Sequence, residues 1–148
     1  MLKTLSFAAL TLAALAIAAP APAVAQEAPN PETTYADIEA TLGVVPSHIK
    51  SYPPQAVAGA WATTKGLLFD PSNALEPKVK SLIGLAVAAQ IPCEYCIWLE
   101  TKLAKDQGAT DDEVSEAIAQ AGYIRMWSTV INGSQVDFET FKSEFGSP

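Results

Sequence analysis

Apolar residues recur at the spacing of an α-helix along most of the chain, and no stretch of useful length alternates between apolar and polar residues. Tyr35, Ile38 and Leu42, for example, lie at i, i+3 and i+7, and Gly43 follows where a helix cap is expected. The other predicted helices are one turn around His48, residues 55–68, residues 77–91, residues 93–107, residues 110–132 and a last piece through Phe138, Phe141 and Phe145. The pattern therefore predicts an all-α fold of about six helices.

Two of these helices have strong start signals. Pro77 suits a first helical position, and Thr110 and Glu113 form a capping box, in which each side chain bonds a free backbone N–H. The helix after Pro77 is apolar on nearly every side, so we expect it to be the buried helix. The helix after Thr110 is the longest, and its predicted core stripe consists of Val114, Ala117, Ile118, Ala121 and Ile124.

The first 25 residues have a different pattern. They include 19 apolar residues, their only charge is Lys3, and they end in the small residues Ala23-Val24-Ala25. This arrangement is typical of a secretory signal peptide, with cleavage expected before Gln26. The apolar centre of about 15 residues is short for a membrane-spanning helix, so a retained anchor is the weaker alternative. We expect an exported, periplasmic protein in which residues 26–32 form a flexible arm and residues 33–148 form one domain.

The mature chain is strongly acidic. Eight Lys and Arg residues face 16 Asp and Glu residues, because only Lys3 is lost with the signal peptide. Such a surface repels phosphate groups, and no cluster of Lys and Arg along the sequence reverses this effect. We therefore expect no nucleic-acid partner and no association with the membrane after cleavage.

The two cysteines, Cys93 and Cys96, lie close together in the sequence. A disulfide between them would close too small a loop to stabilise the fold much. Cys93 opens a predicted helix, where the helix dipole lowers a thiol pKa, and Cys96 lies one turn further on the same face. The pair is suited to reversible redox chemistry, with an inert surface disulfide as the alternative. One His and no further Cys make a zinc site improbable, so we expect no metal and no other cofactor.

The apolar helix of residues 75–89, the motif Cys93-Glu94-Tyr95-Cys96 and the helix start at residues 108–114 occur in a familiar order and spacing. They resemble the carboxymuconolactone decarboxylase-like family and, within it, the alkylhydroperoxidase D-like branch. The resemblance covers roughly residues 36–133. It implies an all-α fold that assembles into trimers or hexamers, with a CxxC pair that reduces hydroperoxides.

The chain departs from that branch at the positions that relay protons to the thiols. The resemblance implies a Glu twelve residues before the first Cys and a His four residues after the second, and this chain has Ser81 and Glu100 there. The residue before the second Cys, which is His in some members, is Tyr95. Only Cys93 and Cys96 match the pattern of the branch intact.

Glu100 has two interpretations. An ionised carboxylate one turn after Cys96 would raise the thiol pKa by like-charge repulsion, whereas a half-buried carboxyl could stay protonated and donate a proton to a leaving alkoxide. The alternative is a solvated residue, or one that forms an ion pair with Lys80 or Lys102.

Three other kinds of residue could take part in the site. The Tyr95 hydroxyl is a candidate for a hydrogen bond to a thiolate or substrate, with a packing role as the alternative. His48 is expected to have a surface or capping role, with a fold towards the cysteines as the alternative. Trp61, Trp98 and Trp127 fall at helical core spacing and are predicted to be packing residues.

Together these observations predict an exported thiol-dependent oxidoreductase of the alkylhydroperoxidase kind, with Cys93 and Cys96 as catalytic thiols and Glu100 and Tyr95 as further candidates. Its expected partners are a hydroperoxide or disulfide substrate, a thiol reductant of unknown identity and other copies of the chain, because helices this apolar need more cover than six short helices provide. Two alternatives are thiol-disulfide exchange and a non-catalytic helical oligomer that has lost the relay. Lactone decarboxylation is least supported, because that branch does not depend on a CxxC pair.

Overall fold

The computed structural model describes residues 30–146, and every regular element in this range is helical. The elements are α1 (Pro31–Leu42), α2 (Ser47–Lys50), the 3-10 turn η1 (Pro54–Ala56), α3 (Val57–Leu68), α4 (Pro77–Gln90), α5 (Glu94–Asp106), α6 (Asp111–Gly133) and α7 (Phe138–Phe145). The all-α prediction is confirmed, with α2 as the single turn at His48. The predicted signal peptide and most of the predicted arm lie outside the described residues.

Local sequence signals account for where the helices begin and end. α1 begins at Pro31, two residues earlier than predicted, because the Asn30 side chain accepts a hydrogen bond from the Glu32 N–H and proline suits the first helical position. Gly43 ends this helix with a φ of 76°, a conformation that glycine adopts without strain. The capping box of α6 is present, since the Thr110 and Glu113 side chains each accept a hydrogen bond from the other residue's backbone N–H.

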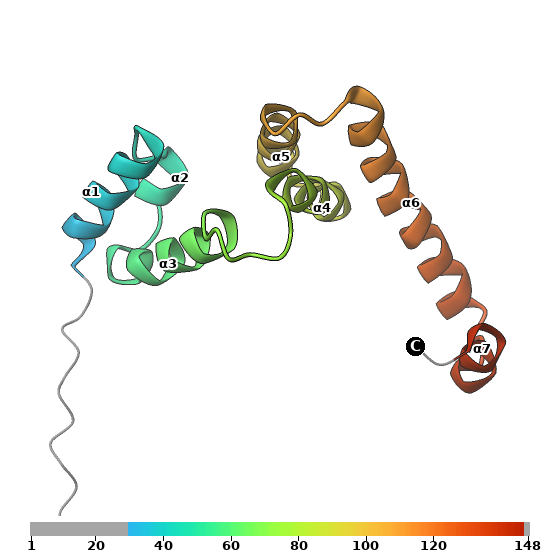
Figure 1. Ribbon diagram of the computed structural model, residues 1–148. Coiled ribbons are helices and arrows are strands. Elements are labelled where there is room, and N and C mark those ends of the chain that lie inside the picture. Colours follow the sequence, from blue (N-terminus) through green and yellow to red (C-terminus); the bar gives the residue numbers. More distant parts are fainter. Residues whose placement is uncertain (1–29, 147–148) are drawn as a thin grey trace, which may run out of the picture.

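α1 to α3 form one group of helices, α4, α5 and the first half of α6 form a second, and α7 follows the far end of α6 (Figure 1). The first group has its own small core, in which Ile38 of α1 packs with Val57 and Trp61 of α3. The Trp61 indole N–H also donates to the Asp37 carboxylate at 2.7 Å. This group is therefore held by packing and hydrogen bonds within residues 31–68.

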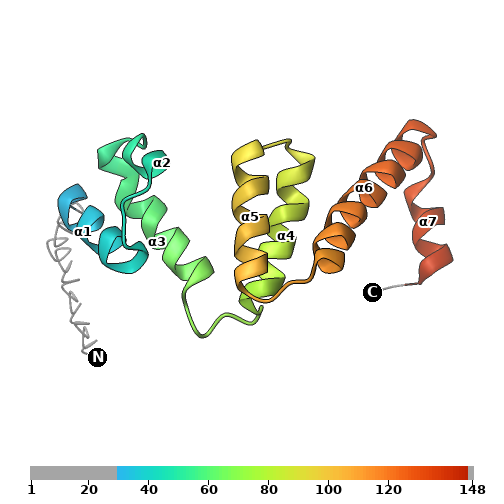
Figure 2. The same cartoon turned by 90° about the horizontal axis from the view of Figure 1, so that it is seen from above.

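α4 lies between α5 and the first half of α6. It forms a hairpin with α5 (Figure 2) and packs against α6. Side-chain bonds join α4 and α6 at both ends, from Lys78 to the Glu113 carboxylate and from the Gln90 amide to the Ala121 carbonyl, each at 2.7 Å. The start of α5, which carries the cysteine motif, is thus placed by the best-packed helix pair in the molecule.

α4, predicted to be the buried helix, has more buried residues than any other described helix, but it is not covered all round in the single chain. Only one side is covered, by way of Ser81, Leu85 and Ala88, whereas Ile83 and Val87 are half exposed. The physical reason is that, within residues 30–146, the extensive contacts of α4 are those with α5 and α6, which reach one side of it.

The predicted apolar stripe of α6 is also largely uncovered. Within it only Ala121 is buried, and Ile118 and Ile124 are exposed. Of the three tryptophans predicted to pack, Trp61 is buried, whereas Trp98 and Trp127 are exposed. The described chain therefore presents extensive apolar surface. Within the described range, no helix is both long enough and apolar enough to cross a bilayer.

Candidate redox site

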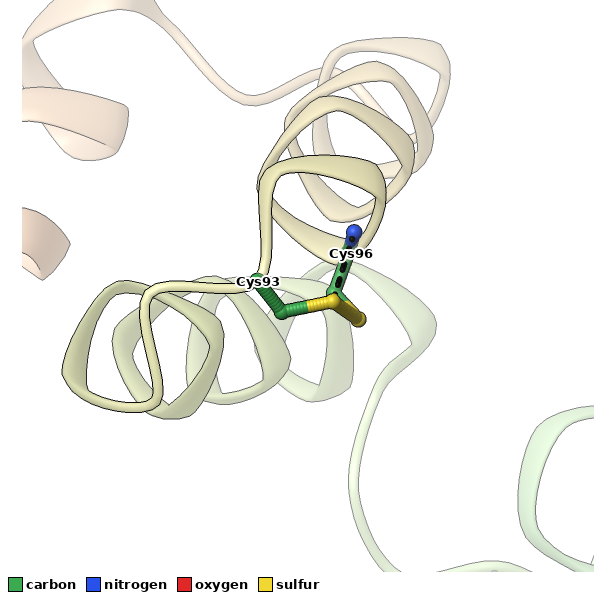
Figure 3. Close-up of a disulfide and its surroundings, with 2 residues drawn as sticks. All are labelled: Cys93 and Cys96. Carbon is green, nitrogen blue, oxygen red and sulfur yellow. Dashed lines mark hydrogen bonds between the residues drawn. A yellow bond between two sulfur atoms is a disulfide. The ribbon is translucent and has the colours of Figure 1, made fainter.

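Cys93 and Cys96 form a disulfide at the junction of α4 and α5, with 5.3 Å between their Cα atoms (Figure 3). Pro92 lies in the short turn after α4, and the Cys93 N–H then donates to the Ala88 carbonyl at 3.1 Å. Cys93 is the N-cap of α5, so it lies one position before the helix that it was predicted to open. The turn and the helix start together fix both sulfur atoms beside the end of α4.

The Cys93 sulfur occupies the position of a helix-capping acceptor. The Cys96 backbone N–H donates to it at 3.3 Å, in the way that a Ser or Asp side chain usually caps a helix. Unpaired N–H groups and the positive end of the helix dipole stabilise negative charge at this place. In the reduced protein the same geometry favours a thiolate at Cys93.

The surroundings of the disulfide are open and aromatic. Both cysteines are only partly buried, and the side chains of Tyr95 and Trp98 are 86% and 67% exposed. The Tyr95 hydroxyl makes no hydrogen bond with any residue between 30 and 146, so the structure does not bring it to the sulfurs. A molecule approaching the disulfide from solvent would meet these two rings.

Glu100 lies one turn after Cys96 and is partly buried where α5 meets α4. Its side chain packs against Gly84 of α4, so closely that a Cβ atom at position 84 would lie 2.7 Å from the Glu100 Cδ and 2.8 Å from its Oε2. The predicted ion pairs are absent from the described chain, because Lys80 donates instead to the Leu67 carbonyl and Lys102 pairs with Asp106. Neither lysine that was considered as an alternative partner therefore pairs with Glu100.

Burial raises the pKa of the Glu100 carboxyl above the ordinary value for a glutamate. Glu113 shows the opposite shift, because a hydrogen bond from Lys78 lowers the pKa of its carboxyl. Glu100 has desolvation without a compensating cation, so it holds its proton to a higher pH than a solvated glutamate does.

Ser81, the other position where the relay pattern is broken, lies on α4 one turn before Gly84 and is 7% exposed. Of the two departures from the family pattern, Ser81 is thus buried on α4, and Glu100 lies where α5 contacts α4. Sequence reasoning missed Gly84. The signal was a lone glycine inside an apolar helix, which commonly marks a close approach of another group.

A cavity of about 880 Å³, also missed from the sequence, lies beside this site. Tyr95 and Trp98 line it from the start of α5, and His48 lines it from α2. The remaining walls are mostly apolar and include Leu42, Ile49, Trp61, Leu68, Phe69 and Leu103. The structure therefore brings His48 and Tyr95 to one cavity. Among residues 30–146, no group of three or more His, Cys, Asp and Glu side chains could hold a metal ion.

A CxxC disulfide at a helix start, on an all-α fold, is an arrangement compatible with thiol redox chemistry. The model of the carboxymuconolactone decarboxylase family matches residues 54–136, which is more than half of the chain. The chain therefore belongs to the carboxymuconolactone decarboxylase family.

Two comparisons refine this placement. The structure is similar to the crystal structure of the alkylhydroperoxidase AhpD core from Rhodospirillum rubrum, with a TM-score of 0.66 and 25% identity over 76% of this chain and 85% of that one. The AhpD-like fold expected from the sequence is thus confirmed. A Paracoccus denitrificans protein described as uncharacterized protein 4 in cox locus is 40% identical over 53 residues, or 36% of this chain. The match spans about half the length (48%) of that curated relative.

Proposed function

We propose that this chain is a thiol-dependent oxidoreductase that reduces hydroperoxides through Cys93 and Cys96. The observation that carries the proposal is the disulfide at the N-cap of α5 in a chain with the AhpD-like fold. One thiolate attacks the terminal peroxide oxygen, the O–O bond breaks, and the alkoxide leaves as an alcohol after taking a proton. The resulting sulfenic acid then condenses with the second thiol, which forms the disulfide and releases water.

A thiol reductant must return two electrons and two protons to the disulfide in each cycle. An exported compartment keeps such pairs oxidised unless a dedicated reductant reaches them. The open surroundings of Cys93 and Cys96 leave room for such a partner. We assign Tyr95, whose exposed ring lines the cavity, a role in contacting the peroxide substrate or the reductant.

The test is a stopped-flow measurement on the reduced mature chain mixed with hydrogen peroxide or cumene hydroperoxide. Trp98, two residues after Cys96, reports on the closing disulfide through its fluorescence. We expect a second-order rate constant well above that of a free thiol, lost in Cys93→Ser and Cys96→Ser. A rate no faster than that of free cysteine would rule out the peroxidase.

Thiol-disulfide exchange with other exported proteins is the second candidate function. The exposed Tyr95 and Trp98 side chains favour it, because a protein partner could reach the disulfide over these rings. This function predicts fast reaction with disulfide substrates and slow reaction with peroxides, so the same reduced chain distinguishes the two activities.

We further propose export of the chain and its assembly into a homotrimer or homohexamer. The pattern of residues 1–25 supports export, and the exposed apolar side chains of α4 and α6 support assembly. Mass spectrometry of the exported protein should give a chain that begins at Gln26. Recovery of the uncleaved chain from the cytoplasm would contradict export.

A further inference from the structure

Gly84 forms a notch in the surface of α4, and the Glu100 side chain of α5 fills it. Besides the carboxyl atoms, the Glu100 Cγ would lie 3.1 Å from a Cβ atom at position 84. Any residue larger than glycine would therefore displace the carboxyl. Because the carboxyl lies at the far end of a flexible side chain, this displacement can occur without moving either helix.

The notch also sets where the carboxyl lies relative to the cysteines. Glu100 follows Cys96 by four residues, and residues at this spacing are neighbours on one face of a helix. Helical side chains lean towards the N-terminus, which brings the Glu100 side chain back towards Cys96. The carboxyl thus lies against Gly84 of α4, on a residue that follows Cys96 by one turn of α5.

No cation neutralises the carboxyl in this place. On α4, Lys78 pairs with Glu113 and Lys80 donates to the Leu67 carbonyl. On α5, Lys102 pairs with Asp106 and Lys105 with Asp111, while Glu94 is exposed at the helix start. Within the described chain no ion pair includes Glu100, and burial raises the pKa of its carboxyl.

We propose that Glu100, held in the Gly84 notch, is the acid-base group of the thiol chemistry. This inference rests on the proposed function. The Glu100 carboxylate takes the proton of the attacking thiol as its sulfur attacks the peroxide. The same proton then passes to the departing alkoxide, which leaves as the alcohol. The second thiol attacks the sulfenic acid, and water leaves as the disulfide forms. Two thiols and one hydroperoxide thus give one disulfide, one alcohol and one water.

In this scheme Gly84 is a positioning residue. Gly84→Ala keeps the carboxyl but pushes it out of the notch, and alanine favours a helix more than glycine does. Gly59→Ala is the matched control, because a Cβ atom there would meet nothing within 4 Å. For Glu100→Gln the matched control is Glu39→Gln, an exposed carboxylate on α1.

The first measurement is the rate of thiol alkylation by iodoacetamide against pH in the reduced mature chain. A nearby carboxylate raises a thiol pKa, so Glu100→Gln and Gly84→Ala should each lower the midpoint by about half a pH unit or more. Both control variants should keep the midpoint of the parent chain. Unchanged midpoints in Glu100→Gln and Gly84→Ala would overturn the inference.

The second measurement is the second-order rate of peroxide reduction at pH 7. Glu100→Gln should be at least about tenfold slower, although more of its thiol is ionised, because the alkoxide has lost its proton donor. Gly84→Ala should also be slower, and adding it to Glu100→Gln should cause no further loss. Rates that are unchanged, or losses that simply multiply in the double variant, would overturn the inference.

The two measurements separate this inference from the proposed function. If the parent chain reduces peroxides no faster than a free thiol, the peroxidase proposal fails. The alkylation midpoints alone then test whether Glu100 is an acid-base group for the thiols. Shifted midpoints would then support Glu100 as the acid-base group of another thiol reaction, and unshifted midpoints would overturn it. Far-UV circular dichroism of each variant shows whether the helices are intact.

Discussion

Glu100 is a partly buried, ionisable side chain one helical turn after Cys96. An acid whose pKa is raised by folding binds its proton more tightly in the folded chain than in the unfolded chain. The protonated Glu100 carboxyl therefore stabilises the folded chain. This stabilisation is fully present below the pKa that the group has in the unfolded chain, and it is lost as pH rises through its pKa in the folded chain. The ionised form destabilises the fold at neutral pH.

We therefore expect Glu100→Gln to be at least as stable as the parent chain at pH 7. The difference between the two proteins should shrink towards acid pH, where the parent carboxyl is also neutral. Urea unfolding of the reduced proteins at pH 4, 5, 6 and 7 measures this. Lower stability of the variant at pH 7, with little change at pH 4, would contradict the direction of the pKa shift.

At the scale of single residues, the sequence indicated which side chains could react, but it did not indicate which residues surround them in the fold. Cys93 and Cys96 were found because two cysteines at a helix start have few interpretations. Glu100 was found only as a mismatch to a pattern. The two lysines considered as alternative partners bond elsewhere, which spacing along the chain does not reveal. Gly84 was missed because a glycine makes no interaction of its own.

The hairpin of α4 and α5 is the element that carries the site. Its disulfide closes a loop of a few residues at a turn that backbone hydrogen bonds already define, since the Cys93 N–H bonds the Ala88 carbonyl. Opening the disulfide removes little conformational restriction from the unfolded chain. The redox pair can therefore cycle without unfolding its helices.

Reduction should accordingly leave the far-UV circular dichroism spectrum unchanged, and the midpoint of thermal unfolding should fall by no more than a few degrees. Spectra and melting curves with and without tris(2-carboxyethyl)phosphine measure this. A loss of helical signal on reduction would show that the disulfide holds α5 in place.

The start of α6 offers a test of an element boundary that was predicted correctly. Thr110→Ala removes the hydroxyl that accepts the Glu113 N–H, and the loss of such a cap typically costs about 1 kcal/mol of stability. Thr101→Ala, on α5, is a suitable control because Thr101 has no capping role. Equal stability of the two variants in urea would contradict a contribution from the capping box.

Helix positions followed from periodicity and caps, which are local properties, so all six longer helices were predicted from the sequence. Burial did not follow in the same way. Periodicity shows that α4 and α6 are apolar, but it does not say whether the cover comes from the same chain. In the described residues Ile83 of α4 and Ile124 of α6 have no such cover.

At the scale of the whole molecule, α1 to α3 form one group and α4 to α6 a second, and both expose apolar side chains (Figure 1). Patches of this extent usually mark contact surfaces. The proposed homotrimer or homohexamer would cover them. The cavity beside the disulfide lies between the two groups.

We expect size-exclusion chromatography with light scattering to give three or six times the mass of one mature chain at micromolar concentration. Ile124→Lys places a charge on the exposed apolar face of α6 and should lower that mass, whereas Ser115→Lys, at an exposed polar position of α6, should not. A monomeric parent chain would contradict the proposal.

The uncovered faces of α4 and α6 also bear on how the protein matures. A single folded chain that exposes them is prone to aggregation and is accessible to proteases. Assembly of such chains is second order in their concentration, whereas proteolytic loss is first order. Rapid synthesis would therefore favour complete particles, and slow synthesis would favour degradation. The yield of active protein should then rise more steeply than the amount of chain made.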